Sequence, residues 1–368
     1  MRIKNRLLLA ACTLLWVLLP TAASAQHDTQ STWEQPNRIV AMSTVGGWAD
    51  SYRKALRERD IIDENDNWIA GDTHFIQMGE FLFQGHSVLE CVELLKKLEP
   101  QAEAGGGKVH VLLGFFEGMA LRGDAHRIRK PNYEHLADPN DEAIQAELEQ
   151  ERQKRWQETY DYDPTLPDSE RELLANRYGS YFDIIFEHPG AWVFIQKFAK
   201  GTELGDWLRT KNSAIQLGPY IFSTGGIHPD LAQTPLDEIN AMVREDVNDD
   251  HVFLQIMGVE SKLPIWWRAP QNYTNPEAFM YIKDLIEKRD ITALIINHTT
   301  DNGRSKDRWN LYQIMSYWHD ETEARVAPAA LEITKGAGDV GRDLFVYWEI
   351  GNRVPTRSPY PKSRFLDD

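Results

Sequence analysis

The chain has 368 residues, of which 42% are hydrophobic and 11% aromatic, so it can bury one large α/β core or two small ones. Its 40 basic and 56 acidic residues give a formal charge of −16. A surface this acidic repels nucleic acid and anionic membranes, which argues against both as partners. Solubility is the simplest reason for such a charge.

The first 25 residues have the pattern of an export signal. MRIKNR is basic, LLLAACTLLWVLLP is apolar, and Ala23 and Ala25 are small residues, an order that predicts a signal peptide cleaved after Ala25. The stretch ending in Cys12 resembles a lipoprotein box, so a lipid anchor and an uncleaved anchor remain as alternatives. No other stretch approaches the roughly 20 apolar residues of a membrane span. We therefore expect a periplasmic or secreted bacterial protein.

Removal of the signal leaves Cys91 as the only cysteine, so no intramolecular disulfide can form. Cys91 lies on the apolar side of an amphipathic helical pattern, which favours a place in the core. Export without disulfides favours the bacterial periplasm or exterior.

After a polar linker at 26–37, strand-like runs alternate with amphipathic helical patterns. The strand-like runs are RIVAM, THFIQM, KVHVLL, PYIF and ALII, and each ends in a loop rich in glycine or polar residues. The helical patterns are ADSYRKALRERDII, SVLECVELLKKLEPQAEA, LDEINAMVREDV and AFMYIKDLIEKRD. This alternation predicts an α/β domain over 38–350 with functional loops at the carboxyl ends of the strands, followed by a tail at 351–368.

Residues 126–185 interrupt this alternation with a highly charged, helix-prone segment. It contains too few apolar residues for a core of its own, so we expect a helical insertion in the domain. The insertion is either a solvated excursion or a lid or arm that docks a protein or peptide partner.

Two short motifs are weak signals. Residues 336–341 match G-x-G-x-x-G, but a strand-like run follows instead of a helix, which argues against a dinucleotide site. DENDN at 63–67 resembles the start of a calcium loop, but Trp68 and His74 occupy its glycine and final glutamate positions, so we expect a turn.

The five loops after the strand-like runs read STVGGW, GEFLFQG, GFFEG, STGGIHPD and NHTTDNG. Their order, together with RIVAMS, DENDNWIAGDTHFIQMG, LGDWLRTK and TGGIHPD, resembles the calcineurin-like metallophosphoesterases over about residues 38–350. The resemblance is greatest to the bacterial branch related to Shewanella-like protein phosphatases. It implies a β-sandwich flanked by helices, in αββα layers. It also implies two divalent metals (Mn, Fe or Zn), about 3.5–4 Å apart, that hydrolyse a phosphoester.

Most residues that perform this chemistry in the family are replaced in this chain. In the first loop the family has Asp-x-His-Gly, and here Thr44 and Gly46 stand at the two ligand positions. In the second loop Glu80 stands at the bridging aspartate, and Gln84 replaces the phosphate-binding arginine. Both metal ligands of the first loop and one positive charge are therefore lost.

The other three loops show the same loss. In the third, Phe115 and Phe116 replace the metal-binding asparagine and the acid histidine, and Glu117 is kept. Thr224 replaces the histidine of the fourth loop, whereas His298 is kept in the fifth. Arg268 is aligned with a second phosphate-binding arginine.

Only Glu80 and His298 remain as donors, and two donors cannot hold a pair of divalent cations. His298 is therefore more simply a hydrogen-bonded core residue than a metal ligand with Glu80. Phe83, Phe115 and Phe116 are expected to fill the vacated space, together with Phe81 or Trp48. The alternative is that the aromatic residues line a pocket for a ligand without phosphate.

Two functions follow from this pattern. The first is an exported pseudophosphatase that acts by binding a protein, a peptide or another ligand and needs no cofactor. The second is a divergent phosphoesterase with residual metal-assisted hydrolysis, in which Glu80, His298, Glu117 and Arg268 take part.

Overall fold

The computed structural model describes residues 30–82, 85–124, 128–181, 188–248, 262–268, 276–297, 306–308, 311–314, 328–338, 342–349 and 352–355. The predicted signal sequence, Phe83, Gln84 and His298 lie outside these ranges. Among the described helices, none is both long and apolar enough to cross a membrane.

Twelve described strands form two six-stranded sheets. The first sheet has the order β12-β11-β10-β2-β3-β4, and the second has the order β1-β5-β6-β7-β9-β8. The first is built from β2 (Arg38–Met42), β3 (His74–Gln77), β4 (Lys108–Val111), β10 (Ala330–Thr334), β11 (Leu344–Glu349) and β12 (Asn352–Pro355). The second is built from β1 (Thr32–Trp33), β5 (Ala214–Leu217), β6 (Tyr220–Ser223), β7 (Ala293–Asn297), β8 (Lys306–Arg308) and β9 (Leu311–Ile314).

Alternation along the strands explains how the two sheets pack. In β2, Ile39 and Ala41 point into the layer between the sheets, whereas Val40 and Met42 point to the helices outside. Phe222 and Ile295 of the second sheet meet this inner layer. The two faces of each sheet are therefore both apolar, as a sandwich covered by helices requires.

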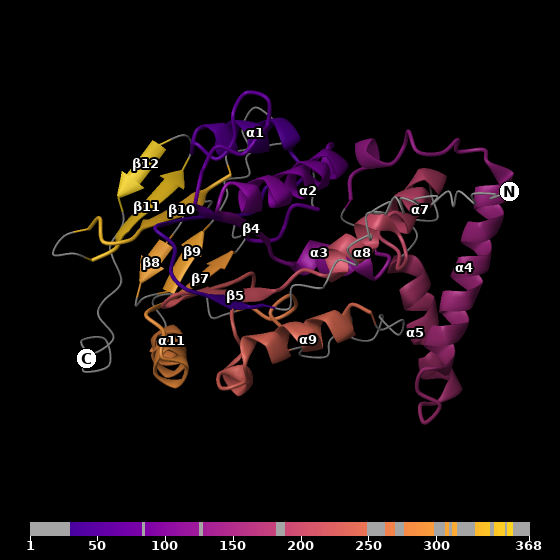
Figure 1. Ribbon diagram of the computed structural model, residues 1–368. Coiled ribbons are helices and arrows are strands. Elements are labelled where there is room, and N and C mark those ends of the chain that lie inside the picture. The colour runs from indigo at the N-terminus through magenta and orange to yellow at the C-terminus, as the bar shows by residue number, and fades with distance from the viewer. Residues whose placement is uncertain are drawn as a thin grey trace, which may run out of the picture.

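Helices cover both outer faces of the sandwich (Figure 1). On the first sheet lie α1 (Ala49–Arg57) and α2 (Val88–Ala104), and on the second lie α9 (Leu236–Asp246) and α11 (Pro276–Arg289). Cys91 is fully buried in α2. The αββα architecture expected from the sequence is confirmed.

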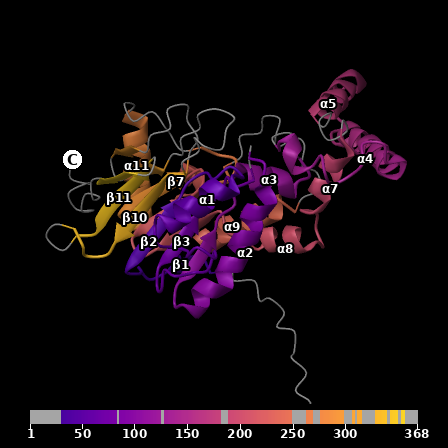
Figure 2. The same cartoon turned by 90° about the horizontal axis from the view of Figure 1, so that it is seen from above.

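The charged segment that follows β4 along the chain and precedes β5 forms two long helices, α4 (Glu142–Asp161) and α5 (Asp168–Tyr181). Asp141 begins α4 by accepting hydrogen bonds from the backbone N–H groups of Ala143 and Ile144. Only the first half of α4 reaches the core, through the buried side chain of Leu148. The two helices therefore project from the sandwich as a charged arm (Figure 2). The helices α7 (Pro189–Gln196) and α8 (Glu203–Arg209) return the chain to the second sheet.

Three segments differ from their expected structure. The polar stretch at 26–37 contains β1, which pairs in parallel with β5, and the tail at 351–368 contains β12, which pairs with β11. Most of the expected GFFEG loop is helical, because Phe115 begins the helix α3 (Phe115–Leu121).

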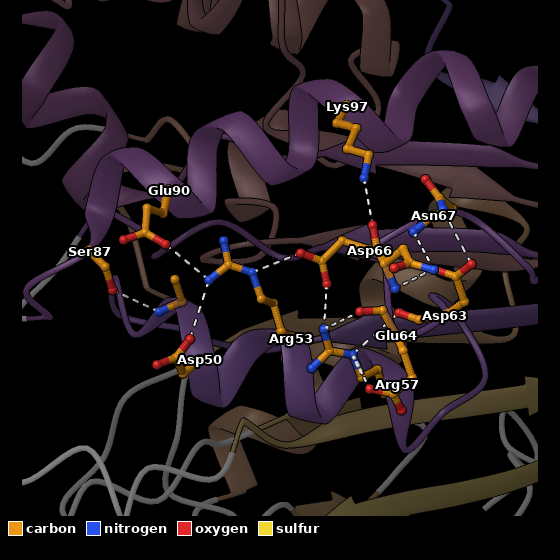
Figure 3. Close-up of polar contacts among 12 residues, drawn as sticks. Asp50, Arg53, Arg57, Asp63, Glu64, Asp66, Asn67, Ser87, Glu90 and Lys97 are labelled. Atoms are coloured by element: carbon orange, nitrogen blue, oxygen red, sulfur yellow. Dashed lines mark hydrogen bonds and ion pairs between the residues drawn. The ribbon is translucent and has the colours of Figure 1, made fainter.

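Both weak motifs form connections. The stretch at 63–67 is a turn in which Asp63 accepts the backbone N–H groups of Asn65 and Asn67, each at 2.8 Å (Figure 3). Arg53 and Arg57 of α1 bind the carboxylate of Asp66 at 3.0 and 2.7 Å, which fixes the turn against the helix (Figure 3). Residues 336–338 lie between the antiparallel strands β10 and β11, where a hairpin replaces the strand and helix of a dinucleotide site.

Candidate functional site

The loops that follow β2, β3, β4 and β6 meet at one edge of the sandwich, where β7 also ends, and we call this region the loop edge. The backbone N–H of Gly46 donates to the carbonyl of Glu80 at 3.1 Å. The Thr224 hydroxyl donates to the carbonyl of Leu113 at 2.8 Å. Such contacts bring together the described positions among those that the sequence assigns to a metal site.

Two of these positions bind other protein groups. Thr44 is fully buried, and its hydroxyl donates to the Asn297 side chain oxygen at 3.2 Å. The amide of Asn297 donates in turn to the carbonyl of Met78 at 2.9 Å. Thr224 is fully buried as well. At Thr44 and Thr224 the polar side chain atoms therefore form hydrogen bonds between neighbouring segments of the protein.

Glu80 occupies the centre of the loop edge. Its backbone is in the left-handed region (φ 59°), which is uncommon outside glycine, and its side chain is buried. The carboxylate oxygen Oε1 accepts the N–H of Phe115 at 3.0 Å and lies 3.5 Å from Nη2 of Arg268. Glu80 and Arg268, both expected site residues, therefore form a pair in which a guanidinium already opposes the carboxylate.

Glu117 has a role that the sequence analysis missed. Its Oε2 accepts the backbone N–H groups of Glu80 (2.8 Å) and Gly114 (2.9 Å), and its Oε1 accepts those of Phe81 (2.9 Å) and Leu82 (3.0 Å). The side chain is completely buried. One carboxylate thus joins the second loop to the start of α3. A glutamate three residues after the helix-capping Gly114 is a sequence signal that could have revealed this role.

The two buried carboxyl groups affect each other. Burial, followed by the charge of Glu80, raises the pKa of Glu117 to about 7, although its backbone N–H donors act in the opposite direction. Burial also raises the pKa of Glu80, while Arg268 and the donors at the start of α3 lower it. Protonation of the Glu117 carboxyl group is therefore expected to change near neutral pH.

An aromatic cluster lies beside this pair. The ring of Phe115 meets Phe116 edge to face at 5.4 Å and Trp266 at 5.5 Å, and the Arg268 guanidinium lies 5.7 Å from its centre. Phe115 and Phe116 are half-buried, so they cover the edge from outside. Gly118 allows this packing, because a Cβ there would lie 2.8 Å from the Trp266 ring.

The described aromatic contacts include the expected pair Phe115 and Phe116 and a partner that was not expected, Trp266. Phe81 is fully buried in the core cluster against which Phe116 packs, and the Trp48 ring meets His86 edge to face at 5.0 Å. The contact of Phe115 with Trp266 joins residues about 150 positions apart, which no local pattern reveals. Trp266 is itself held by a hydrogen bond from its Nε1 to the Asp246 carboxylate at 2.7 Å.

The donors in the described part of the loop edge do not fit a pair of divalent cations. In the described ranges, no three His, Cys, Asp or Glu residues cluster in a way that could hold a metal ion. At the expected ligand positions Thr44 and Thr224 are engaged with protein groups, Gly46 has no side chain, and Phe115 has no donor atom. Of the carboxylates, Glu117 is saturated by N–H groups and Glu80 faces a guanidinium.

The chain was compared with known proteins. No protein-family model matches it. A segment of 121 residues, 33% of the chain, is 33% identical to Shewanella-like protein phosphatase 2 of Arabidopsis thaliana. A longer segment of 283 residues, 75% of the chain, is 18% identical to Shewanella-like protein phosphatase 1 of Plasmodium berghei. The matches span 31% and 65% of the lengths of these two relatives.

Solved structures confirm the fold. A cold-active protein tyrosine phosphatase superposes with a TM-score of 0.61 at 19% identity, covering 90% of this chain and 82% of that one. The cold-active protein-tyrosine phosphatase of a psychrophilic Shewanella species superposes with a TM-score of 0.59 at 20% identity, covering 89% and 84%. At this identity the likeness establishes the architecture of the chain.

Proposed function

Relatives and fold together support membership of the calcineurin-like metallophosphoesterase family, and within that family we propose that this chain acts by binding and has lost two-metal hydrolysis. The observation that carries the proposal is that protein groups already occupy most of the described donor atoms of the loop edge. Its remaining carboxylates bind backbone N–H groups and a guanidinium, and aromatic rings cover it.

The electrostatics of the edge support this proposal. A carboxylate that loses a bound cation is costly to bury unless another positive group or several hydrogen-bond donors replace the cation. Arg268 provides the positive group for Glu80, and four N–H groups provide the donors for Glu117. A divalent cation beside Glu80 would be repelled by this guanidinium.

Packing supports it as well. Each aromatic ring that is buried contributes roughly 1.5–3 kcal/mol, and partial burial contributes less. Phe115 and Phe116 gain this energy at positions where the family has polar catalytic groups. The substitutions therefore stabilise one another, as expected if the edge is selected for structure.

The test is elemental analysis of the purified mature protein for Mn, Fe and Zn, together with hydrolysis of p-nitrophenyl phosphate with each metal added. We expect far less than stoichiometric metal and no turnover above the rate without protein. A triple variant with Thr44→Asp, Gly46→His and Phe115→Asn tests whether the scaffold still accepts metal. Glu90→Gln on the surface of α2 is the matched control. Stoichiometric metal with turnover in the unmodified chain would overturn the proposal.

One observation favours a second function, residual phosphoester hydrolysis. The Oε2 atom of Glu80 is buried without a hydrogen-bond partner in the described ranges, so one donor oxygen remains at the edge. Arg268 beside it could bind a phosphate. In this case Glu80→Gln would abolish a measurable activity, whereas under the first proposal there is no activity to lose.

We also propose that the chain is exported and docks a protein or peptide partner through the arm. The helices α4 and α5 carry nine acidic and five basic residues, which favours a basic partner. Charge-neutral variants of α4, with Glu147→Gln, Glu149→Gln and Glu158→Gln, should lose a partner that co-purifies with the unmodified chain. Unchanged capture would exclude the arm as the docking surface.

A further inference from the structure

A cavity of about 550 Å³ lies beside the outer edge of β4. None of the proposed catalytic or metal positions lines it. Its walls come from the start of the described chain, the second half of α2, the end of α8 and the strand β4 itself. This volume is in the range of about 300–1,000 Å³ that is usual for ligand sites.

Within the described residues, the strand β4 (Lys108–Val111) exposes backbone groups to this cavity up to its carboxyl end, where the N–H of Leu113 donates to the carbonyl of Asn212 at 2.8 Å and a parallel bridge pairs Leu112 with Asn212. It is the last strand of its sheet, and the N–H groups of Lys108 and Leu112 donate to β3, to the carbonyls of Thr73 and Gln77. Because the direction of backbone groups alternates along a strand, those of residues 109 and 111 point away from β3. Before the bridge to Asn212 they line the cavity as a short open sheet edge, which is a template for another extended chain.

A tryptophan lies on each side of this edge. Trp33 is on the side of the inner layer, where its ring meets His110 edge to face at 4.5 Å. His110 is held by His74, with Nε2 and Nδ1 3.0 Å apart. Trp207 is on the side of α2, where its Nε1 donates to Glu99 at 2.7 Å. Both rings are thus fixed in place before any ligand arrives, which lowers the entropy cost of binding.

The charges around the cavity favour a basic ligand. Three carboxylates line it, from Glu99, Glu103 and Asp206, against the two ammonium groups of Lys108 and Lys211. Each ammonium group is engaged with a glutamate, Lys108 with Glu103 at 3.3 Å and Lys211 with Glu99 at 2.5 Å. The formal charge of the whole chain, −16, acts in the same direction over longer distances.

From this geometry we infer that the edge of β4 binds an extended peptide segment of a partner as an additional strand. Alternate side chains of such a strand point to opposite faces, so an apolar side chain would contact Trp33 and the next would contact Trp207. A flanking arginine or lysine of the peptide would face the carboxylates. This binding does not depend on whether the loop edge hydrolyses phosphoesters.

The test uses a library of acetylated and amidated hexapeptides with arginine at both ends and four varied inner positions. Hydrogen exchange of the amides of Val109 and Val111 reports strand pairing directly. At about 1 mM peptide, we expect at least one pool to slow exchange at these amides about tenfold or more. A peptide of that pool with N-methyl groups on the amides that face β4 should lose the effect.

Two variants identify the flanking rings. Trp33→Ala and Trp207→Ala should each weaken binding of the selected peptide about tenfold, because buried tryptophans dominate such contacts. Met280→Ala is the control, because Met280 is exposed on α11 and does not line the cavity, and this variant should bind normally. Metal content and phosphoesterase assays on the same samples separate this inference from the proposed loss of hydrolysis.

Three results would overturn the inference. In the first, no pool slows exchange at residues 109 and 111. In the second, the N-methylated peptide binds as well as its parent, a comparison that needs no protein variant. In the third, the amides are protected without peptide and the chain sediments as a dimer, so that a second copy covers the edge.

Discussion

The buried carboxylate of Glu117 provides the sharpest test of how the loop edge is held together. We consider Glu117→Gln, which preserves size and shape. In the native chain both carboxylate oxygens accept two backbone N–H groups each. An amide has one oxygen only, so its NH₂ group must face two N–H donors in either orientation.

The expected cost follows from this count. A buried N–H that loses its acceptor costs about 1–3 kcal/mol, so two such groups cost roughly 2–6 kcal/mol. Removal of the negative charge offsets part of this cost, because Glu117 no longer repels Glu80 and no longer has to be buried as an ion. We expect the free energy of unfolding to fall by about 2–4 kcal/mol.

The measurement is urea unfolding at pH 8, where Glu117 is largely ionised, followed by tryptophan fluorescence and circular dichroism. Glu90→Gln is the control, because its side chain is 59% exposed and has one ion pair, with Arg53. It should change stability by no more than about 0.5 kcal/mol. If Glu117→Gln is as stable as this control, the carboxylate does not hold the two loops and the account of the edge is wrong.

Three further predictions concern packing, pH and export. Gly114→Ala would place a Cβ 2.8 Å from Oε2 of Glu117. It should lower the free energy of unfolding, measured in urea, by about 1–3 kcal/mol. An unchanged urea midpoint would contradict the close approach of the two loops. Burial, then His74 and Lys108, lowers the pKa of His110 well below its usual 6.5, so the unfolded chain binds a proton that the folded chain does not. The free energy of unfolding should therefore decrease as the pH falls below 6.5, by up to about 1.4 kcal/mol per pH unit. His110→Gln should show a smaller loss between pH 7.5 and 5.5 in urea unfolding, and an equal loss would exclude His110 as the cause. If the chain is exported as proposed, its mass should correspond to cleavage after Ala25, and a retained or lipid-modified N-terminus would contradict this.

The loop edge shows where sequence reasoning succeeds and where it stops. The replacement of donors at Thr44, Phe115 and Thr224 is visible in the sequence, because the motifs have fixed positions along the chain. The hydrogen-bond partners of each remaining donor residue are not visible in the sequence. Glu117 was expected as a residual catalytic group, but it accepts N–H groups from a loop 35 to 37 residues away. Hydrogen bonds of this kind depend on how two loops approach in space.

The sequence by itself determined the alternation of strands and helices, the helical nature of the charged insertion and the burial of Cys91, because these follow from periodic apolar patterns and short-range preferences. The αββα layers were expected from the family resemblance of the loop motifs. Only the tertiary structure decided that Trp266 contacts Phe115, that Arg268 faces Glu80, and that part of the outer edge of β4 lines a cavity between two tryptophans. The order of strands in a sheet and the contacts between distant loops arise from packing of the whole chain, which no local pattern specifies.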